Sequence, residues 1–140
     1  MIAEIYPKVY LYRRIVQAKI FIDNNYSKNI DLNNIADEAF FSKFHFIRQF
    51  KKIYGQTPHQ YLKIVRIEKA MQFLRTNLPV SETCYAVGFE SLGSFSILFK
   101  KEIGFPPQYY RNMAWLKQQQ ARQEPKKFIP HCFIDQFGMG

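Results

Sequence analysis

Apolar residues recur along the chain at intervals of three and four, the spacing that places side chains on one face of a helix. The pattern predicts a first helix over residues 9–25, in which the apolar positions are Leu11, Ile15, Ala18 and Ile22. Asp31 is then placed to cap a short second helix. The apolar positions of that helix are Leu32, Ile35, Ala36 and Ala39. The first part of the chain is therefore predicted to form a long helix followed by a short one.

Two further helices have side chains suited to their ends. Ser42 is placed to cap a third helix that Gly55 ends. The positions predicted to face the core are Phe46, Phe50 and Ile53. The sequence Thr57-Pro58-His59-Gln60 predicts the start of a fourth helix, because the threonine can cap it while the glutamine reaches back. That helix is predicted to be straight, with its apolar positions at Ile64, Ile67, Met71, Leu74 and Leu78.

The second half of the chain repeats the first. The pattern FxxxFKKxxGxxPxxY begins at Phe46 and recurs from Phe95, 49 residues later. Before the second copy, residues 80–87 are predicted to form a helix and residues 88–90 a turn. Each copy thus consists of a short helix, a tight turn and a basic helix, the arrangement of a helix-turn-helix. Pro107 is predicted to begin a short last helix through Tyr110 and Arg111, and Gln118, Gln119 and Gln120 are candidates to extend a helix that Pro125 ends.

Basic residues are concentrated in one segment of the chain. The net charge is +9, and residues 1–41 contribute none of it. Residues 42–66 contain no acidic residue, and their basic residues are Lys43, Arg48, Lys51, Lys52, Lys63 and Arg66. This distribution is expected where a surface meets a polyanion. Charge alone leaves DNA, RNA, an acidic membrane or a merely solvated basic face as alternatives.

The two copies together resemble the DNA-binding domain of the AraC/XylS family. The resemblance extends over residues 10–112 and rests on the paired FKKxxGxxPxxY pattern, with AVGFES ahead of the second copy. It implies seven helices, two helix-turn-helix subdomains and a connecting helix. It also implies regulation of transcription, commonly activation through contact with RNA polymerase.

An all-α fold is therefore predicted, with two helix-turn-helix subdomains joined by a long connecting helix. The predicted boundaries are 1–56 for the first subdomain, 57–78 for the connector, 79–113 for the second subdomain and 114–140 for an extension without an assigned role. At 1.5 Å per residue, the nineteen helical residues 58–76 of the connector span about 28 Å, while one DNA turn spans roughly 34 Å. A monomer is therefore expected to address two successive major-groove segments.

The third helix is predicted to insert into DNA with the face opposite Phe46 and Phe50. Arg48 can donate two hydrogen bonds to guanine, while Phe44 and Ile47 suit thymine methyl groups. The lysines near its end and the cap region at its start suit phosphates. The predicted DNA-binding residues of this copy are Ser42, Lys43, Phe44, Ile47, Arg48, Lys51, Lys52 and Thr57. Packing of Phe44 beneath a loop is the alternative interpretation.

The second copy is expected to contribute less polar recognition of bases. Ile97 stands at the position equivalent to Arg48, and Gly93 at the position equivalent to Phe44. The predicted DNA-binding residues here are Ser91, Gly93, Ser94, Ile97, Lys100, Lys101 and Arg111. We expect phosphate contacts and apolar or shape recognition from them, so that specificity lies mainly in the first copy.

Other function classes receive less support from the sequence. The chain lacks the clustered acid, base and nucleophile of an enzyme and the spacing of a metal site, so no catalytic residue or cofactor is expected. It also lacks a secretory signal and an apolar run of membrane-spanning length, which favours a cytoplasmic protein bound to promoter DNA. A sequence-neutral nucleoid or RNA-binding protein is the alternative function. Cys84 is expected to be buried.

Overall fold

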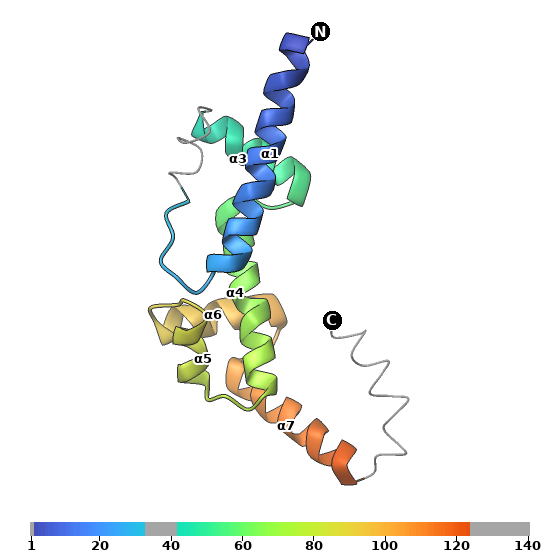
Figure 1. Cartoon of the computed structure of the whole chain (residues 1–140). Coiled ribbons are helices and arrows are strands. Elements are labelled where there is room, and N and C mark those ends of the chain that lie inside the picture. The colour runs from blue at the N-terminus through green and yellow to red at the C-terminus, as the bar shows by residue number, and fades with distance from the viewer. Residues whose placement is uncertain (1, 33–41, 124–140) are drawn as a thin grey trace.

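The structure, a computed structural model, describes residues 2–32 and 42–123 of the chain. Every regular element in this part is an α-helix, which confirms the predicted all-α fold. The helices are α1 (Ile2–Asn25), α3 (Lys43–Tyr54), α4 (Pro58–Arg75), α5 (Val80–Ala86), α6 (Leu92–Ile103) and α7 (Pro107–Gln123), as labelled in Figure 1. Most of the predicted second helix falls on residues 33–41, outside the described residues. None of the described helices combines the length and apolar character needed to cross a membrane.

Helix α4 connects the two halves of the molecule. It lies beside α1 and α3 at one end and beside α5, α6 and α7 at the other (Figure 1). The first core consists of Ile15, Ala18, Ile22, Leu32, Phe46, Phe50, Leu62 and Val65. The second core consists of Ile67, Ala70, Leu74, Cys84, Val87, Phe95, Phe99 and Tyr110. Because α4 supplies residues to both cores, it is the connecting helix that the sequence predicts.

Hydrogen bonds at the helix starts confirm the predicted caps. The Oγ of Ser42 accepts a hydrogen bond from the backbone N–H of His45 at 3.1 Å. Thr57 and Gln60 form a complete capping box. The Thr57 hydroxyl accepts from the Gln60 backbone N–H at 3.3 Å, and the Gln60 side chain accepts from the Thr57 N–H at 3.0 Å. Both helices therefore begin where the sequence predicts, because their first N–H groups have side-chain acceptors.

The sequence repeat is also a structural repeat. Helices α3 and α6 each have 12 residues, a serine cap at the start and a glycine in left-handed conformation at the end. Phe50 meets Tyr61 edge to face with ring centroids 6.0 Å apart, and Phe99 meets Tyr110 in the same way at 5.6 Å. The two copies thus bury equivalent aromatic side chains in equivalent geometry.

Helix α1 is longer than predicted, and α7 includes the extension for which Gln118, Gln119 and Gln120 are candidates. Helix α1 begins at Ile2 instead of residue 9 and runs through Pro7, which lacks the N–H that a helix interior uses. Helix α7 continues past Arg111 to Gln123. The side-chain amide of Gln118 donates a hydrogen bond to the Arg75 carbonyl at 2.6 Å. Helix α7 therefore has a polar attachment to the last turn of α4 that apolar spacing did not reveal.

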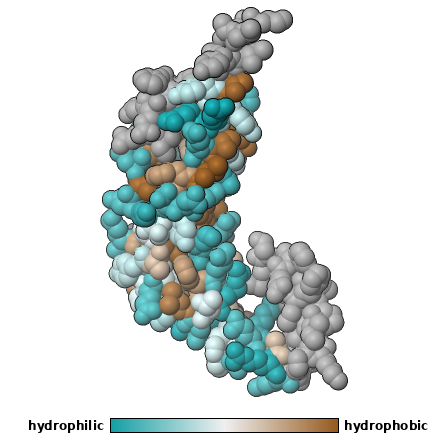
Figure 2. All heavy atoms as spheres, viewed as in Figure 1, coloured by the Kyte–Doolittle hydropathy of each residue, from teal (hydrophilic) through white to brown (hydrophobic). Residues whose placement is uncertain are grey.

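The prediction that Ile53 faces the core is wrong. Its side chain is 40% exposed, and Tyr54 packs against the first core at the end of α3 instead. The repeat explains this, because the equivalents of Ile53 and Tyr54 are Glu102 and Ile103. Ile53 lines a groove of ≈ 490 Å³ with Leu11, Tyr12, Ile15, His45, Gln49 and Lys52. Apolar residues gather on this part of the surface, where α1 and α3 lie (Figure 2).

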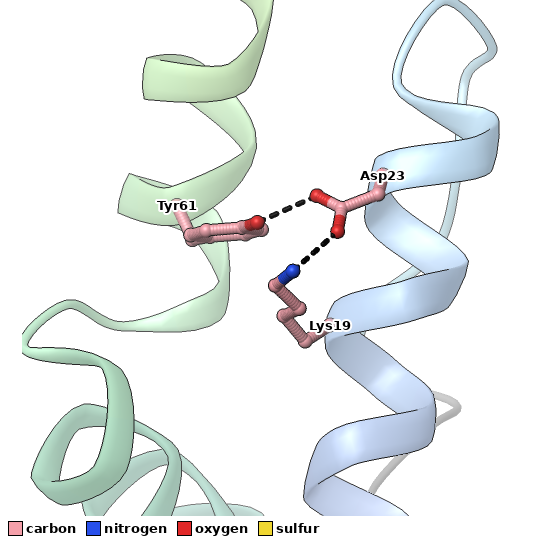
Figure 3. Close-up of polar contacts among 3 residues, drawn as sticks. All are labelled: Lys19, Asp23 and Tyr61. Carbon is pink, nitrogen blue, oxygen red and sulfur yellow. Dashed lines mark hydrogen bonds and ion pairs between the residues drawn. The ribbon is translucent and has the colours of Figure 1, made fainter.

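A polar cluster joins α1 to the start of α4 (Figure 3). The hydroxyl of Tyr61 donates a hydrogen bond to one carboxylate oxygen of Asp23 at 2.5 Å. The other oxygen forms an ion pair with Lys19 at 2.8 Å. Burial, and after it the hydrogen bond to Asp23, raises the pKa of Tyr61 above its ordinary value. The cluster therefore fixes the position of α1 against α4, the helix that follows α3.

Candidate nucleic-acid interface

Helix α3 presents a mixed basic and apolar face to solvent. Its aromatic residues Phe46 and Phe50 are buried in the first core, which directs the opposite face outward. On that face the Phe44 side chain is 73% exposed, and Arg48 is exposed as well. A phenylalanine so exposed gains nothing from burial in the described fold. An exposed aromatic ring and an exposed cation on one face are side chains that can contact base edges in a groove of DNA.

The remaining predicted residues of the first copy lie around this face. Lys43, Lys51 and Lys52 are exposed, while Ile47 is half-buried at the border of the core. Ser42 and Thr57 act as helix caps, as described above, and Ser42 remains exposed. Lys51 and Lys52 lie in the last turn of α3, where their positive charges also interact favourably with the negative end of the helix dipole. The structure therefore brings these residues together on one side of α3 and its two ends.

Helix α6 presents an equivalent face with a different composition. Phe95 and Phe99 are fully buried, and Ile97 on the opposite side is 73% exposed. Ser91, Gly93, Ser94, Lys100 and Lys101 are exposed as well. A Cβ built on Gly93 would meet only the Ser91 Oγ, at 3.7 Å, so packing within the fold does not require glycine there. The absence of a side chain leaves room for another molecule to approach the start of α6.

Two basic residues are engaged within the fold. The Arg111 guanidinium donates a hydrogen bond to the Asn77 carbonyl at 3.0 Å, which ties α7 to the segment after α4. Arg66 lies between the two cores and donates to two backbone carbonyls, those of Tyr26 and Lys28. Burial lowers the pKa of Arg66, although the charge of Glu90 raises it in part. Counting charges in residues 42–66 could not distinguish Arg66 from the exposed cations.

Among the described residues the interface carries little negative charge. Helix α3 has no acidic residue and α6 has only Glu102. In the same part of the chain, no group of His, Cys, Asp or Glu side chains could hold a metal ion. Cys84 is buried in the second core, as predicted, and burial raises the pKa of its thiol. The exposed faces of α3 and α6 therefore have the electrostatic character of a surface that binds a polyanion.

Comparison with known proteins gives matches over most of the chain. A family model described as a helix-turn-helix domain matches residues 35–113. The bifunctional transcriptional activator/DNA repair enzyme AdaA of Bacillus subtilis is 33% identical over 99 residues, which cover 70% of this chain and 47% of AdaA. The chain thus spans about half the length of that relative. The transcriptional activator AarP of Providencia stuartii is 33% identical over 98 residues, 69% of this chain and 73% of AarP.

A solved structure confirms the arrangement of the helices. The DNA-binding domain of the global transcriptional factor AdpA, solved in complex with a target DNA, superposes with a TM-score of 0.70. The alignment covers 76% of this chain and 96% of that domain, at 24% sequence identity. Two basic helices on a shared connecting helix are therefore a known fold.

Proposed function

Because the chain belongs to the AraC/XylS family of helix-turn-helix transcription regulators, we propose that it activates transcription by inserting α3 and α6 into successive major-groove segments of promoter DNA. The observation that carries this proposal is the outward face of α3, where a 73% exposed Phe44 lies on the same side as Arg48. The equivalent face of α6 carries Ile97, which is also 73% exposed. Among the described residues, Phe44 and Ile97 are the most exposed of the large hydrophobic residues.

The exposed residues divide into two kinds of contact. Arg48 donates two hydrogen bonds to a guanine edge, and Phe44 and Ile47 contact thymine methyl groups. The helix starts at Ser42 and Ser91 and the lysine pairs in the last turns contact phosphates, which orient each helix in its groove. Ile97, Gly93 and Ser94 recognise apolar groups and groove shape. Sequence specificity then comes mainly from α3.

Several wider properties follow from this proposal. Two recognition helices on one chain allow a monomer to occupy a bipartite site without forming a dimer. Activation requires a contact with RNA polymerase, and the name of AarP describes an activator. The protein acts at the nucleoid in the cytoplasm and carries out no reaction on the DNA. A sequence-neutral nucleoid or RNA-binding protein is the alternative that the test must exclude.

Selection from a library of random DNA duplexes tests the function directly. The protein is incubated with the library at near-physiological salt, and bound duplexes are sequenced over several rounds. We expect one enriched motif with two half-sites centred about ten base pairs apart, on one face of the helix. Competing RNA and unselected DNA should bind at least about a thousandfold more weakly. Enrichment of no motif, or equal binding to RNA, would contradict the proposal.

A further inference from the structure

The two subdomains touch beside α4 as well as sharing it. Along α4 the first core ends at Val65 and the second begins at Ile67, so that Arg66 lies between them. Tyr26, which follows α1, packs against both cores. We call the place where these parts meet the junction, and it consists of Tyr26, Ser27, Lys28, Arg66, Gly88 and Phe89.

The side chain of Arg66 contacts both sides of the junction. Its Nε donates a hydrogen bond to the Tyr26 carbonyl at 2.7 Å, and its Nη2 donates to the Lys28 carbonyl at 3.0 Å. Its Cζ lies 5.8 Å from the centroid of the Phe89 ring, which belongs to the turn between α5 and α6. A planar guanidinium presents several donors in a fixed fork and can approach an aromatic ring at the same time, whereas an ammonium group is a compact point charge without this fork.

Gly88 shows how closely the turn approaches the other subdomain. Its φ is +98°, and a Cβ added there would lie 2.8 Å from the Tyr26 carbonyl oxygen and 3.1 Å from the Arg66 Nε. Phe89 in turn contacts Phe95 of α6 with ring centroids 5.2 Å apart. A displacement of the junction therefore reaches α6 through a direct packing contact.

We propose that Arg66 is a positioning residue that sets the orientation of α6 relative to α3, and hence the spacing of the two half-sites that the chain recognises. The part of this inference that concerns half-sites rests on the proposed function. An added base pair shifts one half-site by about 3.4 Å and rotates it by about 34°. If α3 and α6 are held in one fixed relative orientation, the chain should bind a duplex with an added base pair more weakly. Loosening the junction should make the chain tolerant of it.

The first test measures distances between α3 and α6 in the protein without DNA. Spin labels are attached through Lys52→Cys and Lys101→Cys, which are exposed and equivalent in the repeat. Cys132→Ser removes one native thiol, while Cys84 is buried and has a raised pKa, which keeps it unreactive. Pulsed dipolar spectroscopy then gives the distribution of distances between the labels. We expect a single narrow distribution in the parent and a broadened or shifted one in Arg66→Met.

Two further variants make this test decisive. Arg13→Met removes the same charge from an exposed position on α1 and should leave the distribution unchanged. Arg66→Lys keeps the charge and the aliphatic chain but loses the fork, so we expect it to broaden the distribution while folding normally. A distribution identical to that of the parent in both Arg66 variants would overturn the inference, even if their thermal stability falls.

The second test uses the duplex obtained by selection and two derivatives with one base pair added or removed between the half-sites. We expect the parent protein to bind these derivatives about tenfold more weakly, comparable to the loss of one base-pair contact. In Arg66→Met the affinity for all three duplexes should become nearly equal. A variant that loses affinity for all three by the same factor would show a purely structural role. Failure of the selection would instead refute the proposed function, and the distance measurement would still decide the inference.

Discussion

Tyr61 and Asp23 form a hydrogen bond of 2.5 Å that joins α4 to α1. In the second copy Tyr110 takes the position of Tyr61, but its hydroxyl accepts a hydrogen bond from Arg75 at 3.2 Å. The repeat thus preserves the aromatic packing of the tyrosine ring and changes the partner of its hydroxyl. Among the described residues, the first copy thus joins its half-buried tyrosine to an acidic residue, whereas the second copy joins its tyrosine to a basic one.

Replacing Tyr61 by phenylalanine should destabilise the protein without changing its helix content. The ring packing against Phe50 remains, while the hydrogen bond to the ion-paired carboxylate of Asp23 is lost. We expect a decrease of about 1–2 kcal/mol in the free energy of unfolding, measured by urea titration. Tyr85→Phe, at an exposed position, is the control and should change this quantity by less than about 0.5 kcal/mol. Equal losses in the two variants would contradict the role of the hydrogen bond.

The same tyrosine should make stability fall at alkaline pH. The pKa of Tyr61 is raised in the folded state, so above about pH 10 the unfolded chain releases its proton while the folded chain retains it. The stabilisation is therefore complete below that pH and decreases as the pH rises toward the raised pKa. Urea titrations at several pH values should show that the free energy of unfolding of the parent approaches that of Tyr61→Phe as the pH rises. A constant difference between the two proteins would show that Tyr61 does not contribute.

Phe44→Ala should separate binding from stability. Because the ring is exposed, its removal should change the free energy of unfolding by less than about 0.5 kcal/mol. The loss of a contact with a thymine methyl group should nevertheless reduce discrimination at one A·T pair, by up to the roughly 1–3 kcal/mol that one mismatched base pair costs. Phe50→Ala on the same helix removes a buried ring, so it should cost about 3–5 kcal/mol in stability. A large loss of stability in Phe44→Ala would show that the ring packs within the fold.

Two glycines offer opposite outcomes for the same substitution. Gly88→Ala forces a Cβ against the Tyr26 carbonyl at a positive φ, so it should lower the free energy of unfolding by more than about 1 kcal/mol. Gly93→Ala adds a Cβ within α6 that makes only an ordinary van der Waals contact with the Ser91 Oγ, so it should stabilise by up to about 1 kcal/mol. Affinity for the selected duplex should fall in both variants, in Gly93→Ala because the methyl group obstructs the approach to DNA. Thermal unfolding and binding titrations, run on both variants, check these expectations.

Local chemistry accounts for what the sequence could predict. The capping residues Ser42, Thr57 and Gln60 and the repeated FKKxxGxxPxxY pattern act over a few residues, so they located the starts of α3 and α4 and the equivalence of α3 with α6. The exposure of Phe44 and Arg48 followed from helical periodicity once the buried aromatic residues were known.

Tertiary contacts account for what the sequence could not predict. The orientation of Ile53 depends on where α1 packs, whereas its helical spacing from Phe46 and Phe50 predicts burial. The engagement of Arg66 depends on two carbonyls that lie 38 and 40 residues away and on the ring of Phe89, 23 residues away. The attachment of α7 to α4 depends on a hydrogen bond from Gln118 to the Arg75 carbonyl, 43 residues away. In each case the deciding partner is distant in sequence, where periodicity carries no information.

The central claim is that sequence specificity comes mainly from α3 and less from α6. Arg48→Ala and Ile97→Ala test this claim together. The quantity to measure is the affinity for the selected duplex divided by that for random DNA, at one fixed salt concentration. We expect Arg48→Ala to lower this ratio by about tenfold to a hundredfold, equivalent to about 1–3 kcal/mol, and Ile97→Ala to lower it much less. Equal losses in the two variants, or no loss in Arg48→Ala, would contradict the account.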